Sequence, residues 1–236
     1  MIALADVDWQ QPWFAPLREL AARLPAGGPA ADALNALGGL APRFVPAEEQ
    51  PPGEAYEAFI ARTGTVPTRD NRHDLFNGLV WRHRPALKRR LNALQAAHIA
   101  AHGVGPTRGP LRDALTRFDE HGALWPGAPP PLAGALAARD WQALFVTHRA
   151  LWQGSRFEVF GHALLEQLAG VPRKALTAHV ALGDPLDWAA DQWATKPFLP
   201  LPVLGIPGWW PANEDPAFYA DSQVFRPARL KAGGPP

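Results

Sequence analysis

The sequence predicts a mainly α-helical protein: one compact multi-helix domain with a long irregular C-terminal arm and at most a small hairpin. Its 236 residues suit one domain with a sizeable core. Its composition, 47% hydrophobic and 19% charged, is typical of a globular chain. Apolar residues recur at helical spacing along most of the chain, whereas the segment after Lys196 is rich in proline and aromatic residues. We therefore expect eight or more helices and little or no sheet.

Within residues 1–236 the chain is expected to divide into N-terminal helices (1–40), a helical core (41–195) and a wrapping arm (196–236). In the first part, residues 12–24 place apolar side chains along one side of a helix. The segment PAGGPAADALNALGG contains a second short helix between glycine breaks.

The first half of the core alternates short irregular segments with helices. A short strand at 43–45 precedes a helix in GEAYEAFIARTG, which should end at Gly64. Asn71 is expected to cap a helix that runs to Pro85, and a second helix then ends near Gly103.

The second half of the core contains weaker signals. A helix from Pro110 should last two turns, and FDEHGALW is typical of a turn or small hairpin around His121–Gly122. PGAPPPLAG is expected to be a loop, followed by helices over 139–152 and 157–169. LTAHVALGDP fits either a helix end or a buried strand, and DWAADQWA fits a last helix.

The C-terminal arm cannot be a regular element because of its prolines, yet it is too apolar to be disordered. We expect it to wrap across the helices and to pack through Phe198, Leu201, Trp209 and Trp210.

Several classes of protein are excluded by missing residues and motifs. Cysteine is absent, which excludes disulfides, thiolate catalysis and cysteine-ligated metals. No phosphate-binding loop, dinucleotide-binding GxGxxG, nucleophile elbow or haem motif is present. The N-terminus has no basic leader before an apolar run, and no apolar segment approaches the roughly 18 residues of a membrane span. We expect a soluble cytoplasmic protein without a membrane partner, whose cofactor is unknown and for which a divalent metal stays open.

Positive charge is concentrated in the middle of a chain whose net charge is only +1. From Arg62 to Arg117 there are eleven Lys or Arg against three Asp, a balance of +8. Such segregation indicates an anionic partner, a small molecule or a nucleic acid, unless these cations pair with acids elsewhere in the fold.

The stretch RDNRHDLFNGLVW and the helix after it carry the first group of candidate site residues. His73 and Asn77 share one face of a helix, and Lys88, Asn92 and Gln95 share a face of the next. Asparagine is a poor residue inside a helix, so these amides indicate either ligand contacts or a structural polar network.

A second candidate group contains histidine and carboxylates. His162 and Glu166 are four residues apart, so the carboxylate can hold the imidazole and raise its basicity; an intrahelical pair without further function is the alternative. Asp119 follows a basic helix and could complete an acid–base or mixed His/carboxylate metal site with His73 or His162. An HD-type phosphohydrolase is excluded because no histidine precedes His73.

Three arginines are the expected anion-binding residues. Arg69, Arg108 and Arg112 flank the helix starts at Asn71 and Gly109, where free N–H groups add to the guanidinium groups. We expect the three to face a common pocket, with Asn77, Lys88 and Asn92 as further substrate-binding residues.

Several blocks together resemble an uncharacterised bacterial family, domain of unknown function 3025. These blocks are PTRDNRHDLFNGLVW, LKRRLNALQAAHI, RGPLRDALTRFDEHGALW, VFGHALLEQL, KALTAH and PLPVLGIPGWWP. The resemblance covers about residues 40–230 and implies a cytoplasmic domain of bacterial type. It implies no reaction, cofactor or catalytic residue.

Three functions stay open. The first is an enzyme that uses His/carboxylate acid–base or metal chemistry on a phosphate-bearing or other anionic substrate. The second is a non-catalytic nucleic-acid-binding module, and the third is a helical interaction protein without a catalytic site. Convergence of His73, Asp119 and His162 in a cleft would favour the enzyme, whereas an exposed stripe of cations would favour nucleic-acid binding. The oligomeric state is not indicated.

Overall fold

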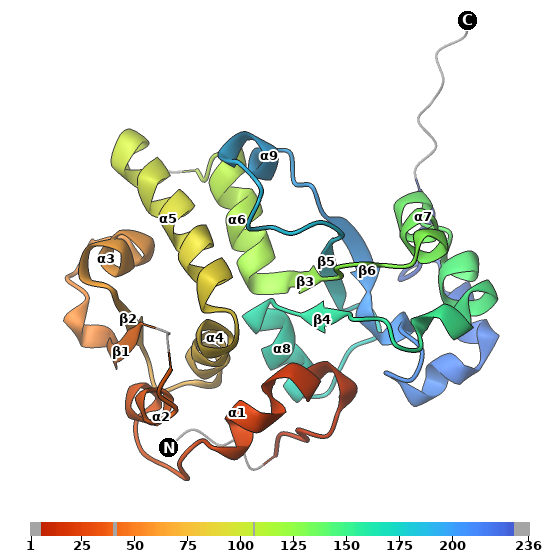
Figure 1. The fold of residues 1–236 in the computed structure, drawn as a ribbon, viewed down its shortest axis with the longest axis horizontal. Helices are drawn as coiled ribbons and strands as arrows, with labels where there is room; N and C mark the ends of the chain where they lie inside the picture. The colour runs from red at the N-terminus through yellow and green to blue at the C-terminus, as the bar shows by residue number, and fades with distance from the viewer. Residues whose placement is uncertain (1–5, 40–41, 106, 229–236) are drawn as a thin grey trace, which may run out of the picture.

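The computed structural model describes residues 6–39, 42–105 and 107–228, which form helices packed around two small sheets (Figure 1). Short 3₁₀ or π turns are denoted η. In chain order the elements are η1 (Pro12–Leu17), α1 (Arg18–Ala22), α2 (Ala30–Ala36), β1 (Arg43–Pro46), η2 (Ala47–Glu49), α3 (Tyr56–Thr63), β2 (Thr65–Thr68), α4 (Arg72–His83), α5 (Pro85–His102), α6 (Pro110–His121), β3 (Gly122–Leu124), α7 (Pro130–Ala138), η3 (Ala143–Thr147), η4 (Arg149–Trp152), β4 (Glu158–Val159), α8 (His162–Ala169), β5 (Thr177–Ala181), α9 (Ala190–Ala194), β6 (Leu199–Pro202), η5 (Val203–Gly205), η6 (Pro211–Glu214) and η7 (Pro216–Ala220).

The expectation of little or no sheet is wrong. β1 and β2 form a parallel pair, and a mixed sheet has the strand order β4-β3-β5-β6, in which only β3 and β5 run parallel. Each strand has two to five residues, too few to establish a period-two pattern against the surrounding helices. The ambiguous LTAHVALGDP segment supplies β5, a central strand whose Ala178 and Val180 are fully buried.

The C-terminal arm also contains a strand, against expectation. β6 carries Pro200 and Pro202, which cannot donate to a sheet, but it lies at the edge of the sheet and pairs only with β5. The expected packing of the four arm residues is confirmed, since Leu201 is fully buried and Phe198, Trp209 and Trp210 pack against the core. Residues 229–236 of the expected arm lie outside the described residues.

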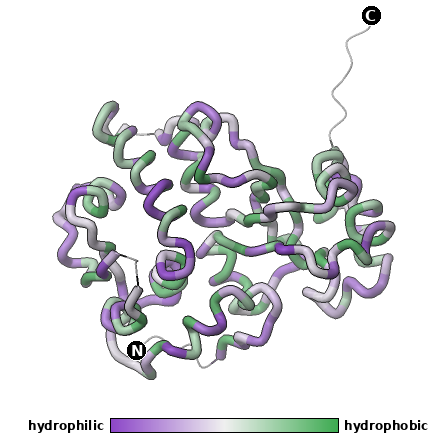
Figure 2. The backbone as a smooth tube through the Cα atoms, viewed as in Figure 1, coloured by the Kyte–Doolittle hydropathy of each residue, from purple (hydrophilic) through white to green (hydrophobic). Residues whose placement is uncertain are grey.

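Four helices, α4, α5, α6 and α8, lie between the small parallel pair and the mixed sheet (Figure 1). Helix α4 packs on both α5 and α8, and α6 packs on α5, α8 and α9. Figure 2 shows a hydrophilic stretch near the start of α5, and the sequence of this helix contains KRR in its first two turns. This polar stretch borders the candidate site.

Several predicted boundaries are confirmed and others are wrong. Helix α3 ends at Gly64, whose φ of 69° is the left-handed conformation that glycine accepts easily. Helix α6 lasts to His121, so FDEH is the end of a helix and not a turn. PPPLAG begins α7 instead of lying in a loop, because proline is well tolerated in a first helical turn.

The helices expected over 139–152 and 157–169 are broken. The first segment forms the short turns η3 and η4, and the second begins with strand β4 before α8 starts at His162. None of the described helices is long and apolar enough to cross a membrane.

Removing the arm should expose the core that it covers. We expect a chain that ends at residue 196 to be insoluble or to lack a cooperative melting transition, because Leu201, Val203 and Leu204 are fully buried. A milder change, Leu201→Ala, should lower the free energy of unfolding by about 2–5 kcal/mol in urea. The control Leu186→Ala, at a side chain that is 41% exposed, should cost well under about 1 kcal/mol. A soluble, cooperatively melting truncation would show that the arm is dispensable.

Candidate functional site

The stretch RDNRHD is first of all a helix start. Asn71 caps α4, since its side-chain oxygen accepts from the Asp74 amide at 2.7 Å. Asp74 in turn accepts from the Arg69 amide and from two nitrogens of its guanidinium, at 2.7–3.0 Å. Asp70 accepts from the Ala30 amide at 2.7 Å. These contacts fix the loop and the first turn of α4, and so they fix where His73 points.

A cleft of about 410 Å³ opens beside this helix start. Helices α3, α4, α5 and α6 contribute to its wall, together with His162 at the start of α8. Of the sequence-predicted site residues, the wall contains Arg69, His73, Asn77, Lys88, Asn92, Arg108, Asp119 and His162. The structure therefore brings together histidines and carboxylates that are far apart in the sequence.

His162 is placed by a tight contact between two helices. It is the first residue of α8, and not a mid-helix residue as the sequence suggested. The preceding Gly161 lies so close to α6 that an added Cβ would be 2.5 Å from the Glu120 carbonyl oxygen and from the His121 backbone. Gly122 O accepts from the amides of Phe160 and Gly161 at 3.0 and 2.8 Å. Gly161 therefore allows the backbones of α6 and α8 to approach each other closely.

The predicted pairing of His162 with Glu166 is wrong. His162 Nδ1 lies 2.8 Å from the backbone oxygen of Asp119, and Glu166 instead lies 2.8 Å from His73 Nδ1. Asp119 is in the last turn of α6, where carbonyl groups lack partners within the helix. The Asp119 carbonyl accepts a hydrogen bond from the His162 imidazole, and the Glu166 carboxylate pairs with His73 of α4 instead.

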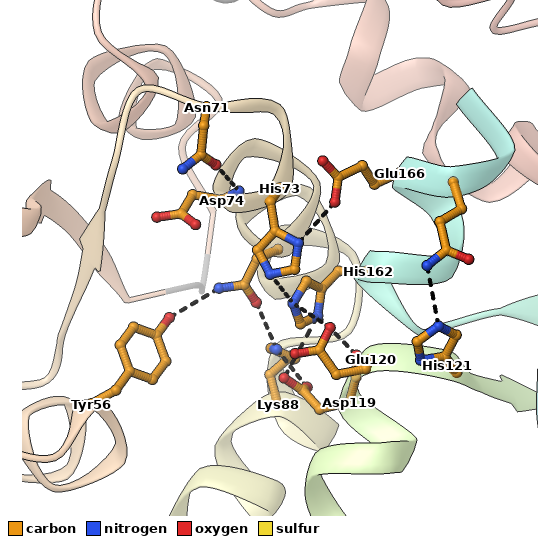
Figure 3. Close-up of polar contacts among 12 residues, drawn as sticks. Tyr56, Asn71, His73, Asp74, Lys88, Asp119, Glu120, His121, His162 and Glu166 are labelled. Atoms are coloured by element: carbon orange, nitrogen blue, oxygen red, sulfur yellow. Dashed lines mark hydrogen bonds and ion pairs between the residues drawn. The ribbon is translucent and has the colours of Figure 1, made fainter. Parts of the chain in front are cut away.

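The two imidazoles face one another. His162 Nε2 lies 3.1 Å from His73 Nε2 (Figure 3). Each ring has its Nδ1 against an oxygen acceptor, which keeps the proton of a neutral ring on Nδ1. Two neutral rings would then direct two lone pairs at the same point.

Glu120 completes this cluster. Its carboxylate lies 3.5 Å from His162 Nε2, and one ligand-type atom from each of His73, Glu120 and His162 falls within 4.8 Å of the other two. Figure 3 shows the Glu120 side chain directed toward the paired rings. Two imidazoles and one carboxylate form a donor set that suits a divalent metal ion.

The electrostatics of the cluster suit a bound cation. Burial lowers the pKa of His162 to about 3, with Lys88 and His73 adding to the effect, so this ring is neutral at ordinary pH. Burial and the neighbouring Asp119 carboxylate raise the pKa of Glu120 above its usual value. A cation between these groups would relieve both effects.

Lys88 and Asp119 form a partly buried ion pair next to the histidines. Lys88 is 4% exposed, and its Nζ donates to Asp119 Oδ1 at 2.6 Å and to Asn77 Oδ1 at 2.7 Å. Burial alone would raise the pKa of Asp119, but the charge of Lys88 and its hydrogen bond act against burial, and the pKa lies below its usual value. Asn77 donates in turn to the Tyr56 hydroxyl at 2.9 Å.

The three predicted anion-binding arginines do not share one pocket. Arg69 and Arg108 contribute to the cleft wall, whereas Arg112 is buried and outside it. Arg69 already pairs with Asp74. Arg112 is a buried residue of α6, whereas Arg108 lies before this helix begins.

Two buried amides of the cleft wall have no protein partner. Asn92 and Gln95 are 9% and 5% exposed, and neither forms a hydrogen bond within the part of the chain that the structure describes. Both lie on α5, one and two turns beyond Lys88.

The basic central third does not form one exposed stripe. Lys88 is buried, Arg82 donates to the Gly38 carbonyl, Arg84 pairs with Glu158, and Arg90 donates to the Trp188 carbonyl. Most of these cations therefore stabilise contacts within the fold.

Sequence reasoning missed Glu120 and Tyr56. Glu120 stood beside Asp119 in a segment taken for a turn, where adjacent acids are commonly solvated. An amphipathic pattern continued through FDEH would have placed it on the last turn of α6. Tyr56, one of only two tyrosines, carried no signal that distinguished it from a core residue.

Comparison with known families gives one match. A family model described as "Protein of unknown function (DUF3025)" matches residues 42–193 and 181–229. Neither the curated proteins nor the solved structures yield a match to the chain.

The contact at Gly161 should be sensitive to a single methyl group. Gly161→Ala would push α8 away from α6, and we expect the free energy of unfolding to fall by about 1–3 kcal/mol or more. Gly134→Ala is a matched control, because this glycine of α7 has open space around its Cα. There the extra methyl should raise stability by about 0.4–1 kcal/mol. Equal free energies of unfolding in urea for the two variants would contradict this contact.

Proposed function

The chain belongs to the DUF3025 family of proteins of unknown function, and because membership carries no reaction, we propose a function from the cleft itself. We propose an enzyme that uses a divalent metal ion, held by His73, Glu120 and His162, in a reaction on an anionic small molecule. The chemistry would be that of a Lewis acid, in which the metal polarises a substrate oxygen or lowers the pKa of a bound water.

The observation that carries the proposal is the 3.1 Å separation of two Nε2 atoms whose rings are both held through Nδ1. Two lone pairs at this distance repel unless a cation or a proton lies between them. A carboxylate behind a metal-binding histidine is the usual arrangement for orienting the ring, and Glu166 lies in that place behind His73.

The distances also suit a first-row metal. Ligand atoms about 2.0–2.1 Å from a tetrahedral zinc ion lie about 3.3 Å apart. The N–N distance of 3.1 Å and the N–O distance of 3.5 Å lie on either side of that value. Three protein ligands leave a further coordination position for water or substrate, which is typical of catalytic and not of structural sites.

The surrounding cations support an anionic substrate. Lys88 sits beside the cluster, and Arg69 and Arg108 lie in the same cleft wall. Arg108 has no salt-bridge partner among the described residues, so its guanidinium is available to a phosphate or carboxylate.

A metal-free acid–base site is the second candidate. The Glu166 carboxylate, His73 and His162 form a continuous line in which a proton between the two rings would replace the metal. A nucleic-acid-binding module and a helical interaction protein are supported less, because the histidines and carboxylates meet in a cleft and most central cations are engaged elsewhere.

Metal content separates these candidates. Protein purified without an affinity tag, or reconstituted with zinc, should hold about one divalent ion per chain by elemental analysis. His73→Gln, Glu120→Gln and His162→Gln should each lose it, whereas His148→Gln, a histidine outside the cleft, should not. Glu166→Gln should weaken zinc binding by about 10–100-fold, because it removes the group that orients His73.

Melting curves provide the control. If the variants lose the metal and their unfolding free energy, compared with that of metal-free wild type, changes by only about 1–2 kcal/mol, the histidines are ligands. If wild type binds neither metal nor anion and both histidine variants melt far below it, the enzyme is ruled out and His162 is a core histidine.

A further inference from the structure

The hydrogen bonds from Lys88 to Tyr56 have only one allowed direction. A lysine ammonium group can donate but not accept, so the Asn77 atom at 2.7 Å from Lys88 Nζ must be the amide oxygen. The Asn77 nitrogen then faces Tyr56 and donates to its hydroxyl oxygen at 2.9 Å. The two partners therefore fix which end of the Asn77 amide is oxygen and which is nitrogen, and the flipped orientation is excluded.

The last donor in this chain has no acceptor. Tyr56 receives a hydrogen bond from Asn77, and its own O–H proton has no partner among the described residues. Tyr56 belongs to the cleft wall. Burial raises the pKa of Tyr56 well above its usual value, so the phenol keeps this proton and acts as a donor. The phenol can therefore donate a hydrogen bond to a ligand bound in the cleft.

Positive charge lies near this donor. Arg69 is within electrostatic reach of Tyr56, as are the carboxylates of Asp74, Asp119 and Glu57. Arg69 Nε and Nη2 donate to Asp74, and Nη1 has no hydrogen bond to any residue that the structure describes. Lys88 is joined to Tyr56 through Asn77. A hydrogen-bond donor within electrostatic reach of a guanidinium group suits an oxyanion better than a neutral carbonyl.

We propose that Tyr56 and Arg69 form an oxyanion subsite, which binds a phosphate or carboxylate group of the substrate beside the metal centre. The inference rests on the proposed function, because it says where the anionic group of the substrate would bind. Tyr56 is here a binding residue, and its role requires no proton transfer.

The charges of the cleft wall make this subsite dependent on the metal. Its four carboxylates are Glu57, Asp74, Asp119 and Glu120, against the three cations Arg69, Lys88 and Arg108. A divalent ion turns this balance from negative to positive. An anion should therefore bind the zinc-loaded protein more tightly than the metal-free protein.

The test is calorimetric titration of zinc-loaded full-length protein with inorganic phosphate and, separately, with acetate. Tyr56→Phe removes the donor and keeps the ring. The matched control is Tyr219→Phe, the other tyrosine of the chain, whose hydroxyl donates to the Gly205 carbonyl away from the cleft. Zinc affinity and melting temperature are measured for all three proteins.

We expect at least one anion to bind wild type, and its affinity to fall about tenfold or more in Tyr56→Phe while zinc affinity is unchanged. Tyr219→Phe should melt lower but bind the anion as wild type does. Preference for phosphate or for acetate assigns the substrate group. If zinc binds but neither anion does, or if Tyr56→Phe binds the anion as tightly as wild type, the subsite is overturned and the metal site stands. If wild type binds no zinc, both proposals are overturned.

Discussion

The contact between the end of α6 and the start of α8 is the constraint on which the candidate site depends. Gly161 lets the two backbones meet, and the Gly122 carbonyl holds them there by accepting hydrogen bonds from two backbone amides. A helix end always leaves carbonyl groups without partners, and here one of them, that of Asp119, sets the tautomer of His162. The orientation of the His162 ring is therefore fixed by a backbone carbonyl and not by a neighbouring side chain.

The cleft concentrates groups that are unfavourable inside a protein. A lysine that is 4% exposed, two buried amides without partners and two facing imidazoles lie along one wall. Each costs stability unless it is compensated, as Lys88 is by Asp119 and Asn77. The rest of the chain offsets this with a continuous core rich in large aromatic side chains, such as Trp125, Trp193 and Phe118. Buried polar and charged groups that are unfavourable for stability are common at ligand-binding sites.

Features set by neighbouring residues could be predicted from the sequence, and features set by distant contacts could not. The Asn71 cap and the end of α3 at Gly64 depend on a few adjacent residues, and both were predicted. The strands of the mixed sheet depend on partners far along the chain. The candidate residues His73 and His162 were identified by residue type. The spacing of residues within a helix predicts which side chains share a face, but it does not predict which residues of another helix they contact. Glu166 therefore has a different partner from the expected one, and Glu120 was missed.

The arrangement of the cluster has a consequence for how such a protein is assembled. His73 and His162 are 89 positions apart, and their helices, α4 and α8, pack directly on each other. An ion bound by both would cross-link the two helices as a disulfide does, by closing a long loop of chain. Part of the free energy of metal binding would therefore stabilise the folded state. Chain segments could not recruit the ion before they had met, so the ion would be acquired late in folding and would then slow unfolding.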